Sequence, residues 1–162
     1  MTTTDRTGSE FTLSWTLDAP PADVFRAWTD PAHLGWYYND QQPTPTEPIE
    51  LDLRVGGTWR QYMVIDDSTA YFTGGVYLEI VPDERIVFAW GATDGWPKLD
   101  LDRLGDSPVV TVTLDRVGAR TGLTLHVELP PDLADDGLRQ WWSMIRDGWR
   151  DTVDRLAAQF ER

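Results

Sequence analysis

The side chains that could do acid–base chemistry are few and fall in two places. The first group lies in the stretch "PAHLGWYYND" and consists of His33, Tyr37, Tyr38 and Asp40. The second is the pair His126 and Glu128 in "GLTLHVEL". The first group offers a general acid or base, and the pair offers two of the ligands of a metal ion. We find no third ligand for the pair, so we interpret it as facing solvent, and we interpret His33 as a surface residue of a short helix.

Other motifs that would indicate a particular chemistry are missing or incomplete. The chain has no cysteine, which excludes thiolate nucleophiles and zinc–thiolate sites. The stretch "DLDRLGD", residues 100–106, resembles a calcium loop, but its twelfth position is Thr111, where a glutamate is needed. The glycine pairs of "RVGGTW" and "FTGGVY" lack the residues of a phosphate loop, so we interpret them as turns or bulges. We therefore expect no metal and no cofactor.

The charge balance bears on partners and location. Aspartate and glutamate number 27 against 14 lysines and arginines, which gives a formal net charge of -13. Nucleic acids and anionic membranes attract basic surfaces, so we expect neither as a partner. The N-terminal "MTTTDRTGSE" has no apolar segment of a signal peptide, and no apolar run approaches the roughly 18 residues of a membrane span. We expect a cytoplasmic protein that is a monomer or a weak homodimer.

The pattern of apolar residues predicts one α+β domain over residues 1–162, with residues 1–9 disordered. Two short helices are expected within 19–38, and polar loops at 39–48 and 93–107. Strands are expected at 11–18, 49–55, 58–65, 70–81, 85–92, 108–117 and 122–129. Because short turns join most of the neighbouring strands, they should form an antiparallel meander.

A long amphipathic helix should begin near Asp135 or Asp136 and continue almost to the C-terminus. Its apolar residues recur at steps of three and four: Leu138, Trp141, Trp142, Ile145, Trp149, Val153, Leu156 and Phe160. This face must pack on the apolar face of the sheet. Glycine inside a helix costs roughly 1 kcal/mol relative to alanine. We interpret Gly148 as a place where a side chain would intrude on a cavity, with plain close packing as the alternative.

Nine tryptophans in one chain indicate either a cavity lined with rings or a densely packed aromatic core. For a cavity we predict an apolar lining in which Gln61 is a rare polar group. The predicted ligand-binding residues are Trp28, Trp36, Trp59, Gln61, Met63, Phe72, Phe88, Trp90, Trp141, Trp142, Ile145 and Trp149. One predicted inward row consists of Phe72, Val76 and Leu78. In 59–65 and 70–80 these assignments depend on strand parity, which a one-residue bulge would exchange.

Four stretches carry a resemblance to a known family. They are "APPADVFRAWTDPAHLGWYY", "VGGTW", "GGVYLEIVPDERIVFAW" and "GWRDTVDRLAAQF", and together they run through most of the chain from Phe11 to Phe160. In this order they resemble the START-like, or SRPBCC, superfamily. Within it, the chain is most similar to the family named after the ATPase activator of the 90-kilodalton heat-shock chaperone.

The resemblance implies a helix-grip fold, in which a curved antiparallel sheet of about seven strands wraps a C-terminal helix around a deep apolar pocket. Members of the superfamily bind lipids, hormones and polyketides, and some catalyse cyclisation or aromatisation. The chaperone-activating role belongs to longer proteins with a further N-terminal domain, so we do not carry it over. A shared fold does not establish a shared function.

Three functions remain open. The first is the non-catalytic binding or carrying of a hydrophobic, aromatic small molecule, such as a sequestered natural product, with Gln61 or Tyr62 orienting a polar group. The second is a polyketide cyclase or aromatase, which needs an acid or base with a displaced pKa from the first group of side chains. The third is a chaperone-regulating interaction module. We favour the first, because we recognise no catalytic set.

Overall fold

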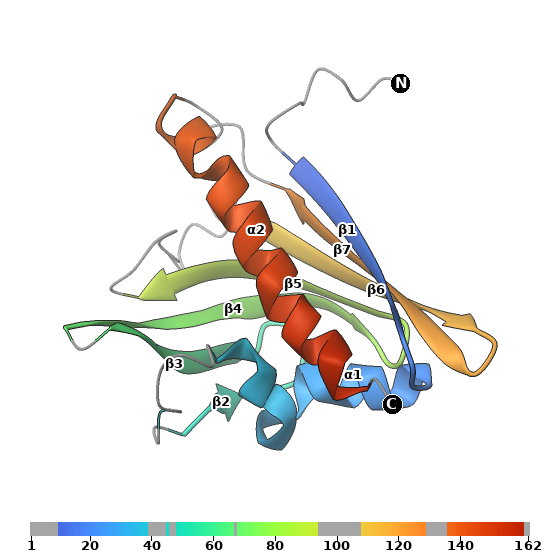
Figure 1. Ribbon diagram of the computed structural model, residues 1–162. Coiled ribbons are helices and arrows are strands. Elements are labelled where there is room, and N and C mark those ends of the chain that lie inside the picture. Colours follow the sequence, from blue (N-terminus) through green and yellow to red (C-terminus); the bar gives the residue numbers. More distant parts are fainter. Residues whose placement is uncertain are drawn as a thin grey trace.

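A computed structural model describes residues 10–38, 45, 48–66, 68–93, 108–128 and 136–160. One seven-stranded sheet carries the helices on a single face (Figure 1). The strands are β1 Glu10–Leu17, β2 Glu50–Leu51, β3 Thr58–Asp66, β4 Thr69–Val81, β5 Arg85–Thr93, β6 Val109–Val117 and β7 Arg120–Glu128. The helices are α1 Pro21–Thr29, the 3-10 helix η2 Pro31–Tyr37 and α2 Asp136–Gln159. The predicted α+β order of one strand, two short helices, six strands and a long helix is confirmed.

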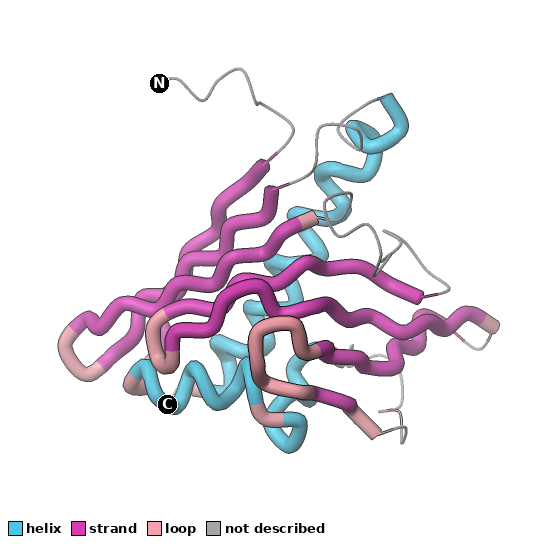
Figure 2. Tube along the Cα trace, turned by 180° about the vertical axis from the view of Figure 1, so that it is seen from behind, coloured by secondary structure: helices cyan, strands magenta, loops and turns pink. Residues whose placement is uncertain are grey.

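The sheet is an antiparallel meander of strands β2 to β7, with the first strand, β1, added at the edge beside β7. Its order is β1-β7-β6-β5-β4-β3-β2, so the first strand pairs with the last. Figure 2, seen from behind, shows the strands in front of the helices, so the face of the sheet turned to the viewer carries none of the described helices. The β6–β7 hairpin turns through two residues, and Gly118 there has φ +63°, a conformation that glycine adopts without strain.

Helix α2 crosses the concave face of the sheet and buries its apolar side there (Figure 1). Trp149, Val153 and Leu156 are buried and contribute to one core with alternate residues of the strands, such as Leu123 and Leu125 of β7. This is the stripe predicted from the steps of three and four.

Two sequence predictions about local structure are wrong. The strand predicted over 49–55 is much shorter, because β2 covers only Glu50–Leu51; beyond it the side chains of Leu53 and Val55 are 41% and 63% exposed. Gly148 does not make room for a cavity, because it is exposed and a Cβ built on it would meet no atom within 4 Å. The steps of three and four place position 148 on the solvent side of α2, next to the inward Trp149.

Other predictions lie outside the described residues. They are the disorder of 1–9, most of the loop at 39–48, the loop from 94 to 107, the turn residue Asp67 and the residues around Asp135. Asp40 belongs to this group as well.

Candidate functional site

Aromatic rings from both layers meet between the sheet and α2. The rings in contact belong to Trp28, Trp36, Tyr37, Trp59, Tyr77, Phe88, Trp90 and Trp149, which we call the aromatic cluster. The Tyr37 centroid lies 4.2 Å from that of Trp36 and 5.1 Å from that of Trp59. Several pairs meet edge to face, the arrangement that ring quadrupoles favour. The cluster therefore links α1, η2, three strands and α2.

Gly75 lies between two of these indoles. It pairs with Trp59 on β3 and with Trp90 on β5. A side chain at this position would collide with the backbone oxygen of Ala89 and approach the ring of Phe88. The interpretation of the "FTGGVY" glycines as a turn or bulge is wrong: they lie in the interior of β4, in unbroken register with β3 and β5, where the neighbouring backbones approach closely.

Gln61 is a polar side chain next to the aromatic cluster. It is fully buried, with 0% exposure. Its Oε1 accepts a hydrogen bond of 3.3 Å from the indole N–H of Trp59, and its Nε2 donates one of 3.3 Å to the backbone oxygen of Leu34. The amide therefore joins β3 to η2. Its buried placement beside Trp59 agrees with the sequence prediction.

The buried and partly buried indole N–H groups of the cluster fall into two kinds. Trp36 donates to the backbone oxygen of Ala27 at 2.9 Å, and Trp90 donates to Oγ1 of Thr73 at 3.2 Å. Among the residues that the structure describes, the indole nitrogens of Trp28 and Trp149 have no hydrogen-bond partner, although these side chains are only 4% and 5% exposed. Most buried donors in proteins are paired, so two unpaired donors in one cluster require an explanation.

Two tyrosines of the cluster have perturbed acidity. Burial raises the pKa of Tyr37 well above its usual value of about 10, and the nearby Tyr77 raises it further. Burial likewise raises the pKa of Tyr77. Burial therefore favours the neutral phenol in both side chains.

An open groove of about 420 Å³ lies outside the cluster, between η2 and the C-terminal end of α2. It is lined by Ala32, His33, Gly35, Trp36, Tyr38, Arg155, Ala158 and Gln159. Trp36 belongs to both features, because it lines the groove and stacks on Tyr37 at an interplanar angle of 27°. Trp36 is therefore the residue that the groove and the ring contacts share.

Arg155 fixes η2 against α2. Its Nε donates to the backbone oxygen of Trp36 at 2.9 Å, and its Nη2 donates to that of Tyr37 at 3.0 Å. These are carbonyls at the C-terminal end of η2, where helix carbonyls lack partners within the helix. Sequence reasoning missed Arg155, since nothing in its spacing distinguishes it from the other arginines of α2. It also missed Tyr37 and Tyr77 as members of the cluster, although Tyr37 was a candidate acid.

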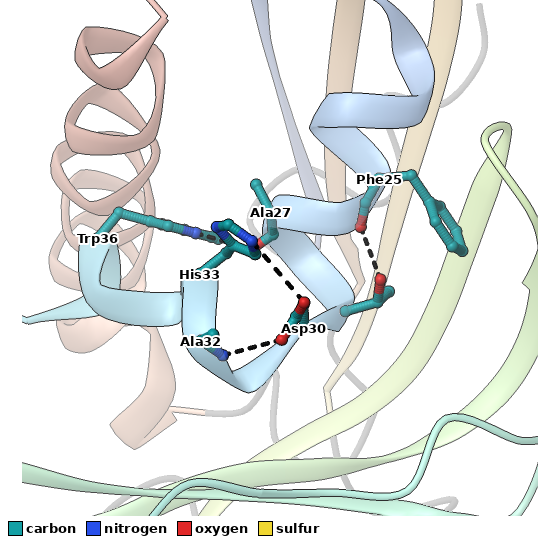
Figure 3. A network of polar contacts seen from close by, with 7 residues as sticks. Phe25, Ala27, Asp30, Ala32, His33 and Trp36 are labelled. Carbon is teal, nitrogen blue, oxygen red and sulfur yellow. Dashed lines mark hydrogen bonds and ion pairs between the residues drawn. The ribbon is translucent and has the colours of Figure 1, made fainter.

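His33 lies on the surface, in the wall of the groove. Its Nε2 is 3.7 Å from Oδ2 of Asp30, whose Oδ1 accepts a hydrogen bond of 3.0 Å from the backbone of Ala32 (Figure 3). Asp30 therefore caps the start of η2, a common use of aspartate at this position. The His33 side chain is 53% exposed, which agrees with our interpretation of it as a surface residue.

His126 lies on the outer face of the sheet. Its Nδ1 is 2.9 Å from Oγ1 of Thr12, and its Nε2 is 3.6 Å from Oε1 of Glu10. Its strand neighbours Leu125 and Val127 are fully buried on the opposite face, as strand alternation predicts. Among the described residues, no group of three or more histidine, aspartate or glutamate side chains is arranged to hold a metal ion.

The predicted inward orientation of Phe72 is wrong. Phe72 pairs with Tyr62, and both lie on the face opposite to the buried Gln61, with the guanidinium of Arg60 3.6 Å from the Phe72 centroid. The inward residues of β4 are instead those of odd number up to Tyr77. A register shift between Tyr77 and Glu79 then leaves Leu78 exposed at 41% and reverses the parity beyond it. Val76 shares the outer parity, opposite Thr58 and Ala89.

The remaining predicted site residues are placed as follows. Ile145 is buried in the core at 7% exposure, and Met63 is partly buried against it. Trp28, Trp36, Trp59, Phe88, Trp90 and Trp149 form the aromatic cluster together with the two tyrosines. The side chains of Trp141 and Trp142 lie outside the described residues, although α2 includes both positions.

The curved antiparallel sheet packs around the C-terminal helix, and this arrangement is the helix-grip fold. The family model described as "Activator of Hsp90 ATPase homolog 1-like protein" matches residues 18–161, and the chain belongs to this family. No curated protein matches the chain. Among the described residues, no helix combines the length and apolar character that a membrane crossing requires.

Solved structures of similar proteins support the same fold. Protein CV1439 from Chromobacterium violaceum is 28% identical, with a TM-score of 0.73, and the match covers 95% of this chain and 98% of that one. An HSP90 activator from Plasmodium falciparum is 23% identical, with a TM-score of 0.59 and 88% of each chain covered. DynU16, from the dynemicin biosynthetic locus, is 21% identical, with a TM-score of 0.65; the match covers 93% of this chain but 46% of DynU16. The last two show the fold alone.

Proposed function

We propose that the protein binds a hydrophobic, aromatic small molecule between the sheet and α2, without transforming it. One observation carries this proposal: aromatic rings from α1, η2, β3, β4, β5 and α2 converge on one interior and offer faces and edges on which an aromatic ligand can stack. Ligand sites are typically apolar with a few placed polar groups, and the buried Gln61 amide fits that composition.

The ligand enters from the groove between η2 and α2 in this proposal. Trp36 both lines the groove and belongs to the ring contacts, so a displacement of this indole would join the two. The ligand-contacting residues are Trp28, Trp36, Trp59, Gln61, Met63, Phe88, Trp90, Ile145 and Trp149, with Trp141 and Trp142 from the first half of α2. Phe72 and Tyr62 do not belong to this set, because they lie on the face of the sheet opposite to Gln61.

Titration of the purified protein with aromatic polyketides, flavonoids, steroids and fatty acids, followed by indole fluorescence, tests the proposal. Saturable quenching by one class is the expected result. Trp59→Leu should abolish or strongly weaken it in a protein that remains folded by circular dichroism. The matched control is Phe72→Leu, which removes a ring of the outer face and should leave binding unchanged. No saturable change with any ligand would contradict the proposal.

Regulation of a chaperone is the second candidate function. The family is named after such an activator, and the Plasmodium falciparum relative is described as one. Leu53, Val55 and Leu78 are exposed. The backbone N–H of Gly56 donates a hydrogen bond to the oxygen of Tyr77, so the chain around Val55 lies beside the chain around Leu78. A direct binding titration against purified Hsp90 tests this candidate. The Val55→Ser variant should weaken the interaction, and the absence of any binding by the unaltered protein would exclude it.

A further inference from the structure

The unpaired indoles of the aromatic cluster indicate which ligand chemistry this interior favours. We propose that the N–H groups of Trp28 and Trp149 donate hydrogen bonds to the ligand, and that the ligand is an uncharged aromatic molecule carrying carbonyl-type acceptor oxygens. The inference rests on the proposed function, because it specifies the ligand of the same site.

The donors are buried and lack a protein partner. Both indoles are at least nine-tenths buried, and neither nitrogen has a hydrogen-bond partner among the described residues. Leaving a buried donor unpaired costs about 1–3 kcal/mol. Neighbouring ring faces are weak acceptors and recover only part of this cost. A ligand oxygen that accepts from either N–H would recover it fully.

Three hydrogen-bond acceptors around the cluster are already engaged by protein donors, which gives the preference its direction. Gln61 Oε1 accepts from Trp59, Thr73 Oγ1 accepts from Trp90, and the backbone oxygen of Ala27 accepts from Trp36. A ligand hydroxyl or amine would compete with these existing bonds, whereas a carbonyl oxygen finds two unused donors.

The charge of the surroundings favours a neutral ligand. Among the described residues no charged side chain is buried as a whole; the buried polar side chains are Gln61, Thr73 and Thr121, together with the tyrosines Tyr37, Tyr38 and Tyr77. The side chains of Arg146 and Arg155 are only partly buried, so a carboxylate placed in this interior would have no fully buried cation beside it. Burial of an unpaired charge is strongly unfavourable. Uncharged ketones and quinones meet both conditions.

The chain provides a matched control for each donor. Trp28 and Trp36 are in edge-to-face contact at 4.7 Å, and Trp149 and Trp90 at 5.3 Å. Within each pair one N–H is unpaired and the other is engaged by the protein. Replacing each indole by phenylalanine therefore removes a similar ring volume from a similar place, but only Trp28→Phe and Trp149→Phe remove an unused donor.

The test compares 9-fluorenone with fluorene, two flat molecules of nearly equal shape that differ in a carbonyl oxygen. Dissociation constants are measured for the unaltered protein and the four variants. The ratio of fluorene to fluorenone dissociation constants should fall at least about threefold in Trp28→Phe or Trp149→Phe, as loss of a hydrogen bond implies. It should stay within about twofold in Trp36→Phe and Trp90→Phe. Equal changes in the variants of both kinds would overturn the inference.

Nuclear magnetic resonance of the indole ¹H–¹⁵N groups gives a readout that a merely structural role would not move. The signals of Trp28 and Trp149, assigned from their variants, should shift downfield with fluorenone and much less with fluorene. Those of Trp36 and Trp90 already have acceptors and should not show this difference. Absence of a carbonyl-dependent shift at both donors in a fluorenone-saturated sample would also overturn the inference.

Charge is tested with fluorenone-2-carboxylate and its methyl ester. The ester should bind at least about tenfold more tightly, and equal affinity would overturn the requirement for a neutral ligand. If fluorene and fluorenone bind with equal dependence on all four indoles, the inference fails while the binding function stands. If neither fluorene nor fluorenone binds but another ligand class quenches the indole fluorescence, the inference again fails and the binding function stands. If nothing binds, both fail.

Discussion

The guanidinium Nε of Arg155 donates a hydrogen bond of 2.9 Å to the backbone oxygen of Trp36, a residue 119 positions earlier in the chain. Through this bond the C-terminal end of α2 holds the short helix η2, whose Trp36 both lines the outer groove and belongs to the aromatic cluster. The bond is therefore relevant both to stability and to access.

Removing this guanidinium should destabilise the fold. In Arg155→Met the aliphatic stem remains, but the oxygens of Trp36 and Tyr37 lose a charged donor. The free energy of unfolding should fall by about 1–3 kcal/mol in urea titrations. The control is Arg150→Met, whose partly exposed guanidinium makes an i,i+3 ion pair with Asp147 and should change stability by less than about 0.5 kcal/mol. Equal effects of the two substitutions would contradict this account.

Gly148→Ala should stabilise the protein. The added methyl group meets open space, and alanine is favoured over glycine inside a helix by roughly 0.5–1 kcal/mol. The contrasting variant is Gly74→Ala, whose Cβ would collide with the backbone oxygen of Trp59; overpacking of this kind costs about 1–3 kcal/mol. Thermal unfolding should move in opposite directions for the two variants. A loss of stability in Gly148→Ala would show that position 148 is not on the exposed side.

Gln61→Met should be costly despite similar side-chain size. The thioether neither donates to the oxygen of Leu34 nor accepts well from the indole N–H of Trp59, so two buried groups lose their partners. We expect a loss of about 2–4 kcal/mol, the sum of two such penalties at the lower end of their range. In the background of Trp59→Phe the same substitution should cost less, because one orphaned group is gone. Equal costs in both backgrounds would show that the Trp59 bond contributes nothing.

Burial of Tyr37 predicts a loss of stability in alkali. The folded-state pKa lies above the unfolded value of about 10, so the folded state retains a proton that the unfolded state releases. The stabilising contribution is complete below pH 10 and declines as the pH rises above it, by about 1.4 kcal/mol per pH unit. Urea titrations between pH 8 and 11 should show a decline less steep by this amount in Tyr37→Phe. Parallel curves would mean that the phenol titrates normally.

The alternation of single strands made much of the fold predictable. Phe11 and Leu17 of β1, and Leu123, Leu125 and Val127 of β7, are buried as the pattern predicts, because each strand has one polar and one apolar side. The element order followed from the turns between the strands. The family resemblance added the helix-grip arrangement.

The same alternation rule does not predict which residues of strand β4 face inward. Its residues are apolar on both parities, so the pattern does not distinguish the inward Tyr77 from the outward Phe72. The bulge at Leu78 exchanges the parity within the strand, and it depends on pairing with β5 rather than on any local sequence signal. Gly148 is a different case, because the steps of three and four that turn Trp149 inward already place position 148 on the solvent side of α2.

The sequence pattern also does not predict hydrogen bonds between residues that lie far apart in the chain. The bonds from Arg155 to η2 and from Gln61 to Leu34 join residues 119 and 27 positions apart, and they arise only once α2 and η2 have docked. The unpaired state of Trp28 and Trp149 is of the same kind. Sequence patterns locate an indole on a face, but they do not say whether its N–H finds an acceptor.

The location of the ligand is the central claim, and methyl groups at both candidate places allow a direct measurement. With the tightest ligand found in the titration panel, intermolecular nuclear Overhauser effects are recorded to the methyl groups of Ile145, inside the core, and of Ala158, in the outer groove. We predict contacts between the ligand and the Ile145 methyl groups. Contacts to Ala158 without any to Ile145 would place the ligand on the outer surface and contradict binding between the sheet and α2.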